Sequence, residues 1–193
     1  MKTHKKSPPT PKSRTFPKHR PGLHGLAPQN NPGKVRDRII LGIDPGTTRI
    51  GYGLIKKTGS KLELLDYGLI EPGRENSKFS ILDRKLSGII KKYKPDLAAV
   101  EKLYFAKNKK TAMAVAESRG IILFILNQHG LKIMEFSPNE IKLAVTGSGS
   151  SDKKTVAHYV SLTLKIGKIS GPDDASDALA AAIRASFERG SPC

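Results

Sequence analysis

From residue 38 onward the chain shows three consecutive strand-like runs, followed by helical and strand-like segments that alternate. The three runs cover residues 38–43, 50–56 and 61–70 and are rich in apolar residues. Short turns containing Gly, Thr and Ser separate them, which predicts an antiparallel meander. Two further strands are predicted at 97–100 and 132–136, each after a helix. This order predicts an α/β fold with a mixed five-stranded sheet and helices on both faces.

Helical periodicity covers the remaining segments of this region. Apolar residues from Phe79 to Tyr93 recur at spacings of three and four, and Pro95 ends this helix. Ser137 and Glu140 have the spacing of a capping box, so a short helix is expected to begin there. The other predicted helices cover residues 109–127, about 152–164 and 172 to about 189.

Four acidic residues stand where such a fold places functional sites. Asp44 ends the first strand at a Pro-Gly turn, and Glu101 ends the fourth strand. Asp174 and Asp177 are three residues apart on the last helix, so they lie on one helical face. Open α/β sheets bind ligands at the carboxyl ends of their strands, where the four side chains could meet. Taken alone, Asp44 would also suit an ordinary turn, because Asp is common before Pro-Gly.

A cluster of these acids would need cations. Four carboxylates held close together repel one another strongly unless positive charge lies between them. The chain has no cluster of His or Cys, and hard oxygen ligands of this kind favour Mg²⁺ or Mn²⁺. The neighbouring Asp173 stands three residues after Ser170, and we predict that it caps the helix and is not a metal ligand.

Three segments, in the same order, resemble the RuvC family of Holliday junction resolvases. They are Ile-Asp-Pro-Gly-Thr at 43–47, Val-Glu-Lys-Leu-Tyr-Phe-Ala-Lys-Asn at 100–108 and Asp-Ala-Ser-Asp-Ala-Leu-Ala at 174–180. The likeness runs from about residue 38 to about residue 187. It implies an RNase H-like nuclease domain at 37–190 and a two-metal mechanism. The catalytic, metal-binding carboxylates that it implies are Asp44, Glu101, Asp174 and Asp177.

The resemblance also implies what these carboxylates do. They would hold two Mg²⁺ ions about 4 Å apart, with Mn²⁺ as a substitute. One ion would lower the pKa of a bound water, and the other would stabilise the departing 3′ oxygen. Asp44 is the natural candidate to bridge both ions, because the central strand places it in the middle of the site.

Two lysines match positions that the family places near the cleaved phosphate. Lys142 follows the capping box, and Lys153 follows a loop rich in Gly and Ser. A lysine there could hold the phosphate or stabilise charge in the transition state. Lys154 is an alternative to Lys153, and a solvated helix face is an ordinary explanation for any of them.

The segment after Glu101 is predicted to contact DNA. Tyr104 stands where the family has an aromatic residue, usually Phe, that can stack on unpaired bases at the junction centre. Packing in the core is the ordinary alternative for Tyr104 and for the adjacent Phe105. Lys107 and Asn108 belong to a polar, basic cluster that could hold the phosphate backbone.

The charge balance fits a polyanionic partner. The 193 residues include 34 Lys and Arg against 17 Asp and Glu, a net charge of +17. Such a balance favours nucleic acid, although a ribosome-associated protein would show it too. No apolar stretch approaches the ~20 residues that cross a bilayer. The single cysteine, Cys193, predicts no internal disulfide and a reducing compartment, the cytoplasm.

Residues 1–36 differ from the rest of the chain. They hold nine basic residues, no acidic residue and seven of the 13 prolines. Because they have almost no large apolar side chains, they cannot bury enough surface to fold, and we predict a disordered basic arm. Non-specific phosphate contacts, targeting and a dispensable solubilising tail remain open as its role.

The leading interpretation is a homodimeric, metal-dependent endonuclease that resolves four-way DNA junctions by paired symmetric nicks in recombination and repair. The family works with the RuvA and RuvB branch-migration proteins. Its dimer is built by the helix predicted at 109–127, where Ala112, Ala116 and Gly120 form a stripe that would also suit packing on its own sheet. A non-catalytic junction-binding module, a related nuclease acting on ribosomal RNA precursor and a sugar-kinase-like ATPase remain as alternatives.

Overall fold

The computed structural model describes residues 37–73, 77–103, 109–169 and 171–188. They belong to one compact unit, Val35–Cys193. The predicted basic arm at 1–36 lies outside the described residues, so its boundary and its role stay predictions. The segment that carries Tyr104, Lys107 and Asn108 lies outside them as well.

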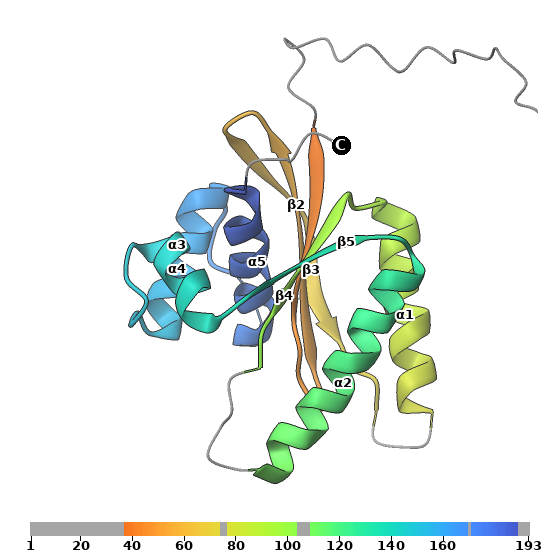
Figure 1. Cartoon of the computed structure of the whole chain (residues 1–193). Coiled ribbons are helices and arrows are strands. Elements are labelled where there is room, and N and C mark those ends of the chain that lie inside the picture. The colour runs from red at the N-terminus through yellow and green to blue at the C-terminus, as the bar shows by residue number, and fades with distance from the viewer. Residues whose placement is uncertain (1–36, 74–76, 104–108, 170, 189–193) are drawn as a thin grey trace, which may run out of the picture. The chain divides into compact units, whose positions relative to one another are not determined.

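Five strands form a single mixed sheet in the order β3-β2-β1-β4-β5 (Figure 1). β1 (Arg38–Asp44), β2 (Ile50–Thr58) and β3 (Lys61–Ile70) form the predicted antiparallel meander. β4 (Leu97–Glu101) pairs with β1 in parallel, and β5 (Lys132–Phe136) pairs with β4 in parallel. β1 is therefore the central strand, and β1 and β4 end side by side at one edge of the sheet.

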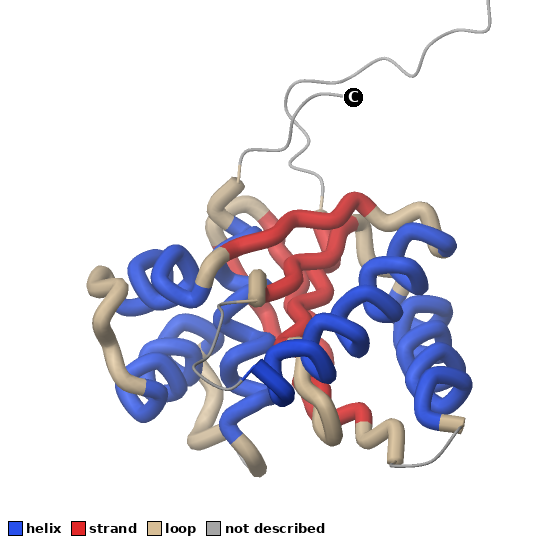
Figure 2. The backbone as a smooth tube through the Cα atoms, turned by 60° about the horizontal axis from the view of Figure 1, so that its bottom comes forward, coloured by secondary structure: helices blue, strands red, loops and turns tan. Residues whose placement is uncertain are grey.

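Helices cover both faces of this sheet, as predicted (Figure 1 and Figure 2). α1 (Lys78–Tyr93) and α2 (Lys109–Gln128) lie on one face. α3 (Pro138–Thr146), α4 (Lys153–Leu164) and α5 (Asp173–Ser186) lie on the other face. The predicted helices and strands are all present, and their ends differ from the predicted ones by a few residues at most.

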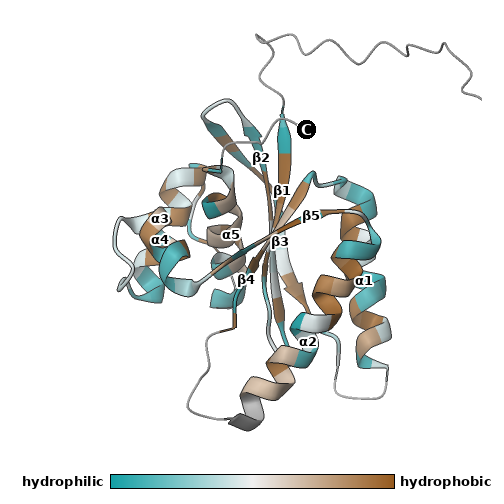
Figure 3. Cartoon of the chain, viewed as in Figure 1, coloured by the Kyte–Doolittle hydropathy of each residue, from teal (hydrophilic) through white to brown (hydrophobic). Residues whose placement is uncertain are grey.

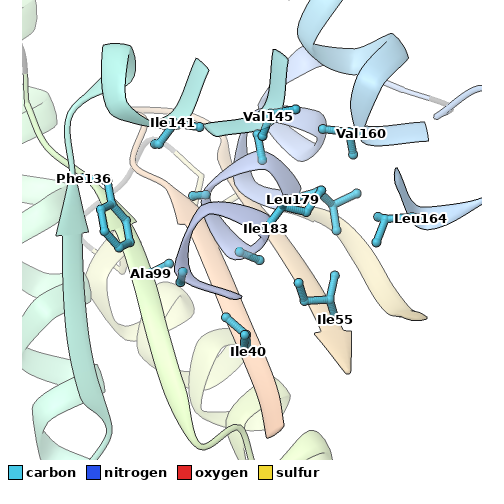
Figure 4. Packing of buried hydrophobic residues seen from close by; sticks show 14 of the residues in the cluster. Ile40, Ile55, Ala99, Phe136, Ile141, Val145, Val160, Leu164, Leu179 and Ile183 are labelled. Carbon is cyan, nitrogen blue, oxygen red and sulfur yellow. The ribbon is translucent and has the colours of Figure 1, made fainter. Parts of the chain in front are cut away.

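The sheet separates two hydrophobic cores, because successive side chains of a strand point to opposite faces. Ile40 of β1 packs with Leu179 and Ile183 of α5, on the face shown in Figure 4. Its neighbour Leu41 and, two residues on, Ile43 pack among residues of α1 and α2 on the other face. Hydrophobic residues accordingly run along the strands between the two helical layers (Figure 3). Both cores hold β1, and hence the position of Asp44, in place.

The backbone of α5 lies directly against the backbone of β1 and β2, with no side chain between them at two points. A Cβ atom at Gly42 would stand 1.9 Å from the carbonyl oxygen of Ala178, and one at Gly51 would stand 1.9 Å from that of Asp174. Neither position has room for a side chain, so glycine is what permits this approach. Gly51 is also the cross-strand partner of Asp44. The contact therefore brings the first turns of α5 next to the end of β1.

The beginnings of the short helices are set by side-chain caps. The Ser137 hydroxyl accepts a hydrogen bond from the Glu140 amide, and the Glu140 carboxylate accepts one from the Ser137 amide at 2.7 Å. This is the predicted capping box. At the start of α4, the Asp152 carboxylate accepts a hydrogen bond from the Thr155 amide at 2.7 Å. Lys142 and Lys153 thus stand on helices whose first turns are fixed.

The capping role predicted for Asp173 is wrong. The residue at the N-cap of α5 is Pro172, in an extended conformation, and no side chain caps this helix. Asp173 is the first helical residue and its side chain is exposed. An acid at this position still interacts favourably with the positive end of the helix dipole. The helix begins later than the Ser170 spacing suggested, because the extended Pro172 stands directly before it.

We predict that Gly42→Ala destabilises the protein, because the added methyl group meets the backbone of α5. Overpacking of this kind lowers the free energy of unfolding by about 3 kcal/mol, which corresponds to a fall in Tm of roughly 6–12 °C. Gly88→Ala is the matched control, since nothing lies within 4 Å of a Cβ atom there. Gly88 lies within α1, so this change should raise stability by about 0.5–1 kcal/mol. Thermal or urea unfolding measures the stability of both variants. Equal changes in stability for Gly42→Ala and Gly88→Ala would contradict the close approach of α5 to β1.

Candidate active site

A cavity of about 220 Å³ opens where β1 and β4 end. Three of the four predicted carboxylates line it, and both predicted lysines do as well. Asp174 does not line this cavity, but its charge acts on Asp44. The residues around the cavity are Asp44, Glu101, Pro138, Ile141, Lys142, Lys153, Val156 and Asp177.

Five different elements contribute the charged side chains of the cavity. Asp44 and Glu101 are the last residues of β1 and β4, which are neighbouring parallel strands. Asp177 comes from the second turn of α5, which the glycine contacts hold against the sheet. Lys142 lies in α3, and Lys153 is the first residue of α4. The site therefore combines two strand ends with three helices from one face of the sheet.

Burial and neighbouring negative charges raise the pKa values of both strand-end acids. Burial, together with the negative charges of Glu101, Asp177 and Asp174, raises the pKa of Asp44 to about 8, against a smaller opposing effect of Lys153. Burial also raises the pKa of Glu101 to about 7, together with the charge of Asp177, while Lys153 and Lys142 lower it. Near neutral pH Asp44 is therefore mostly protonated and Glu101 is partly protonated, and a bound cation would displace these protons.

Two basic side chains hold the acids of α5. The ammonium group of Lys153 lies 2.8 Å from Oδ2 of Asp177, and this hydrogen bond raises the pKa of Lys153. The guanidinium group of Arg49 lies 3.4 Å from Oδ2 of Asp174. With these partners in place, no three Asp, Glu, His or Cys side chains in the described part of the chain are already arranged to hold a metal ion.

Lys153 and Lys154 have different surroundings. Lys153 lines the acidic cavity, whereas Lys154 lines a second cavity of about 740 Å³ between α4 and the loop that leads into α5. Arg49 had no predicted role in the site, because a single arginine after the first strand gives no signal of which acid it meets. Gly42 and Gly51 were missed for the same reason, since their importance depends on how closely α5 packs.

The sequence matches one protein family over most of its length. The family model for the crossover junction endodeoxyribonuclease RuvC matches residues 40–185. RuvC of Petrotoga mobilis is 47% identical over 148 residues, which cover 75% of this chain and 91% of that protein. RuvC of Thermosipho melanesiensis is 42% identical over 146 residues, which cover 74% of this chain and 93% of that protein. The chain belongs to the RuvC family of crossover junction endodeoxyribonucleases.

A solved structure of this family agrees with the fold. RuvC of T. thermophilus in complex with a Holliday junction substrate superposes with a TM-score of 0.72 at 25% identity. The match covers 78% of this chain and 93% of that one. The RNase H-like fold and the resemblance to the resolvase family are confirmed, and so is the prediction of a Holliday junction resolvase, a phosphodiester hydrolase. This membership favours that activity over the three alternatives.

Within the described residues, no helix has both the length and the apolar character that a bilayer crossing requires.

The raised pKa values predict how the chelated, metal-free protein responds to pH. An ordinary aspartate ionises near 3.8, whereas Asp44 in the folded protein ionises near 8. Stability should therefore be highest below pH 4 as far as this group is concerned, and should decrease as the pH rises towards 8. Asp44→Asn cannot ionise, so it should raise Tm at pH 8 in EDTA, and the gain should shrink towards pH 4.

Thermal unfolding at a series of pH values measures this effect. Glu63→Gln is the control, because it also removes one negative charge but changes only an exposed pair with Lys61 at 3.9 Å, which is worth little. A Tm below that of the wild type for Asp44→Asn at pH 8 would contradict the raised pKa of Asp44, which burial and the neighbouring carboxylates cause.

Proposed function

We propose that this resolvase cuts four-way DNA junctions by paired symmetric nicks, with Mg²⁺ bound by Asp44, Glu101, Asp174 and Asp177. The observation that supports this most is the convergence of strand-end and helix-borne acids, with pKa values raised to about 8 and about 7 for Asp44 and Glu101. A fold that gathers like charges in this way suits bound cations.

The donor set fits two magnesium ions, and Mn²⁺ should substitute. All four candidate ligands are hard oxygen donors, which both ions prefer. When bound, such a pair of ions supplies an activated water and stabilises the leaving 3′ oxygen. Asp44 stands at the end of the central strand, with Glu101 on one side and the first turns of α5 above Gly51 on the other. This central position makes Asp44 the ligand around which the metal site would be built.

Loading of the site would release two basic side chains. Lys153 and Arg49 hold Asp177 and Asp174, and both carboxylates would turn from these partners to a metal. The side chain of Lys153 is 60% exposed, so it has room to swing once it is released. It would then be free to donate to an oxygen of the scissile phosphate, next to Lys142 on the same cavity wall.

The complex of T. thermophilus RuvC with a Holliday junction substrate supports the four-way junction as the DNA form recognised here. The net charge of +17 favours phosphate contacts along the junction arms. From the resemblance, we assign base stacking to Tyr104 and backbone contacts to Lys107 and Asn108, in the segment that follows β4.

We further propose a homodimer with one site for each of two opposing strands. Met113 and Phe124 of α2 are 76% and 57% exposed, and exposed Ala116 and Gly120 lie between them along the helix. Large apolar side chains flanking small residues suit close contact with a second copy of the same helix.

From the family, we infer RuvA and RuvB as partners. The single cysteine, Cys193, fits work in the reducing cytoplasm.

The direct test is cleavage of a synthetic four-way junction in Mg²⁺, compared with linear duplex and with single-stranded RNA. We expect the wild type to make paired, symmetric nicks in the junction and to lose this activity in EDTA. Asp44→Asn should bind the junction but leave it intact, because it removes a ligand from the middle of the site.

The outcomes separate the candidate functions. Junction binding without cutting by the wild type would indicate a non-catalytic module. Cutting of RNA in preference to the junction would indicate the ribosomal nuclease. Unaltered cutting by Asp44→Asn would mean that the catalytic site lies elsewhere.

The two adjacent lysines provide a second test. Lys153→Gln should lower the single-turnover cutting rate by about 10²-fold or more, because it removes a positive charge beside the reacting phosphate. Lys154→Gln changes the net charge equally but lies at the other cavity, so its rate should stay close to that of the wild type. Both variants should bind the junction, as measured by fluorescence anisotropy. Equal losses of cutting rate in the two variants would mean that Lys153 contributes only to the overall positive charge of the protein.

A further inference from the structure

Arg119 connects α2 with the end of the strand that carries Glu101. Its side chain is 18% exposed, so most of this side chain lies inside the protein. The Nε group donates a hydrogen bond to the backbone carbonyl oxygen of Glu101, with the two atoms 3.3 Å apart. Another nitrogen of the same guanidinium forms an ion pair with the carboxylate of Glu135 on β5. One side chain thus ties a helix to two adjacent strands.

The geometry of these contacts suits arginine alone among the basic residues. Its planar group presents several N–H donors in fixed directions, so it can hold two acceptors at once and fix their relative position. Partial burial of a guanidinium costs desolvation energy, and it lowers the pKa of Arg119. Glu135 offsets this cost, because its carboxylate neutralises the buried charge.

The carbonyl oxygen of Glu101 lies where the regular hydrogen bonding of β4 ends. Glu101 is the last residue of β4, and the chain leaves the sheet directly after it. On the side of β5, the amide of Lys102 donates to the carbonyl of Phe136 at 2.8 Å. Arg119 holds the preceding carbonyl from α2. The peptide between Glu101 and Lys102 is therefore fixed at both its oxygen and its nitrogen, which sets the direction of the Glu101 side chain.

We propose that Arg119 is a positioning residue for Glu101, which it orients through the backbone without touching the DNA or the metal ions. The charged side chains that shift the pKa of Glu101 are Asp177, Lys153 and Lys142. The contribution of Arg119 is thus geometric, and it rests on the proposed role of Glu101 as a metal ligand. Residues of this kind, one step behind a ligand, commonly change metal affinity or activity by 10–100-fold when they are replaced.

The test compares Arg119→Met and Arg119→Lys in the full-length protein. Arg119→Met retains the packing of the stem but donates no hydrogen bond. We expect it to lower the single-turnover cutting rate about 10–100-fold and to raise the Mg²⁺ concentration for half-maximal rate. Junction affinity, Tm and the molecular mass in solution should stay as in the wild type. Arg119→Lys retains one charged donor and should recover part of the lost rate.

Glu117→Gln is the matched control on the same helix. It weakens the ion pair with Lys78 of α1, at 3.4 Å, and does not reach the active site. Cutting and Mg²⁺ dependence should both be those of the wild type. An effect equal to that of Arg119→Met would mean that any loss of charge on α2 impairs the enzyme, which would overturn the proposal.

Two further outcomes would overturn it. If Arg119→Met cut the junction at the wild-type rate and with the wild-type Mg²⁺ dependence, Glu101 would not need the hydrogen bond from Arg119 to be oriented. A loss of rate that comes with a matching loss of Tm, of junction binding or of dimer mass would assign Arg119 to general stability. Failure of the proposed function is recognised separately, because the wild type would then not cut the junction in Mg²⁺.

Discussion

The close contact between the backbone of α5 and the first two strands is the interaction on which the site depends. Gly42 and Gly51 leave room for the carbonyl groups of Ala178 and Asp174, and residues 178–182 of α5 are completely buried. An α-helix normally packs on a sheet through a layer of side chains. Here that layer is missing at two points, so the helix comes close enough for Asp177 to share a cavity with Asp44.

This packing works against electrostatic repulsion. Burial, together with the charge of Asp177, raises the pKa values of Asp44 and Glu101, and Asp174 adds to the effect on Asp44. The ionised site therefore destabilises the folded chain. The two hydrophobic cores on either side of β1 provide the stability that offsets this cost. Lys153 and Arg49 reduce it further by pairing with the acids of α5. Cations bound at the proposed metal site would relieve this cost, because positive charge favours the ionised carboxylates.

The sequence predicted the parts of this structure that depend on local pattern. Strand-end acids such as Asp44 and Glu101 were found because periodicity locates a strand and the turn locates its end. The capping role predicted for Asp173 was wrong because the exact start of a helix depends on one residue, here Pro172. Gly42 and Arg119 could not be found in this way. Their roles arise from contacts across 136 and 18 positions of the chain, to Ala178 and to Glu101, which no local pattern encodes.

α2 has two faces with different tasks. Met113 and Phe124 face solvent, where we propose a second copy, while Arg119 reaches inward to Glu101 and Glu135. A helix is stiff over this length, because each of its turns is hydrogen-bonded to the next. A shift of α2 on dimer formation would therefore move the carbonyl that Arg119 holds, and with it Glu101, the proposed metal ligand at the end of β4. In an enzyme that must nick two opposing strands, such a link would tie the geometry of each catalytic site to the presence of its partner subunit.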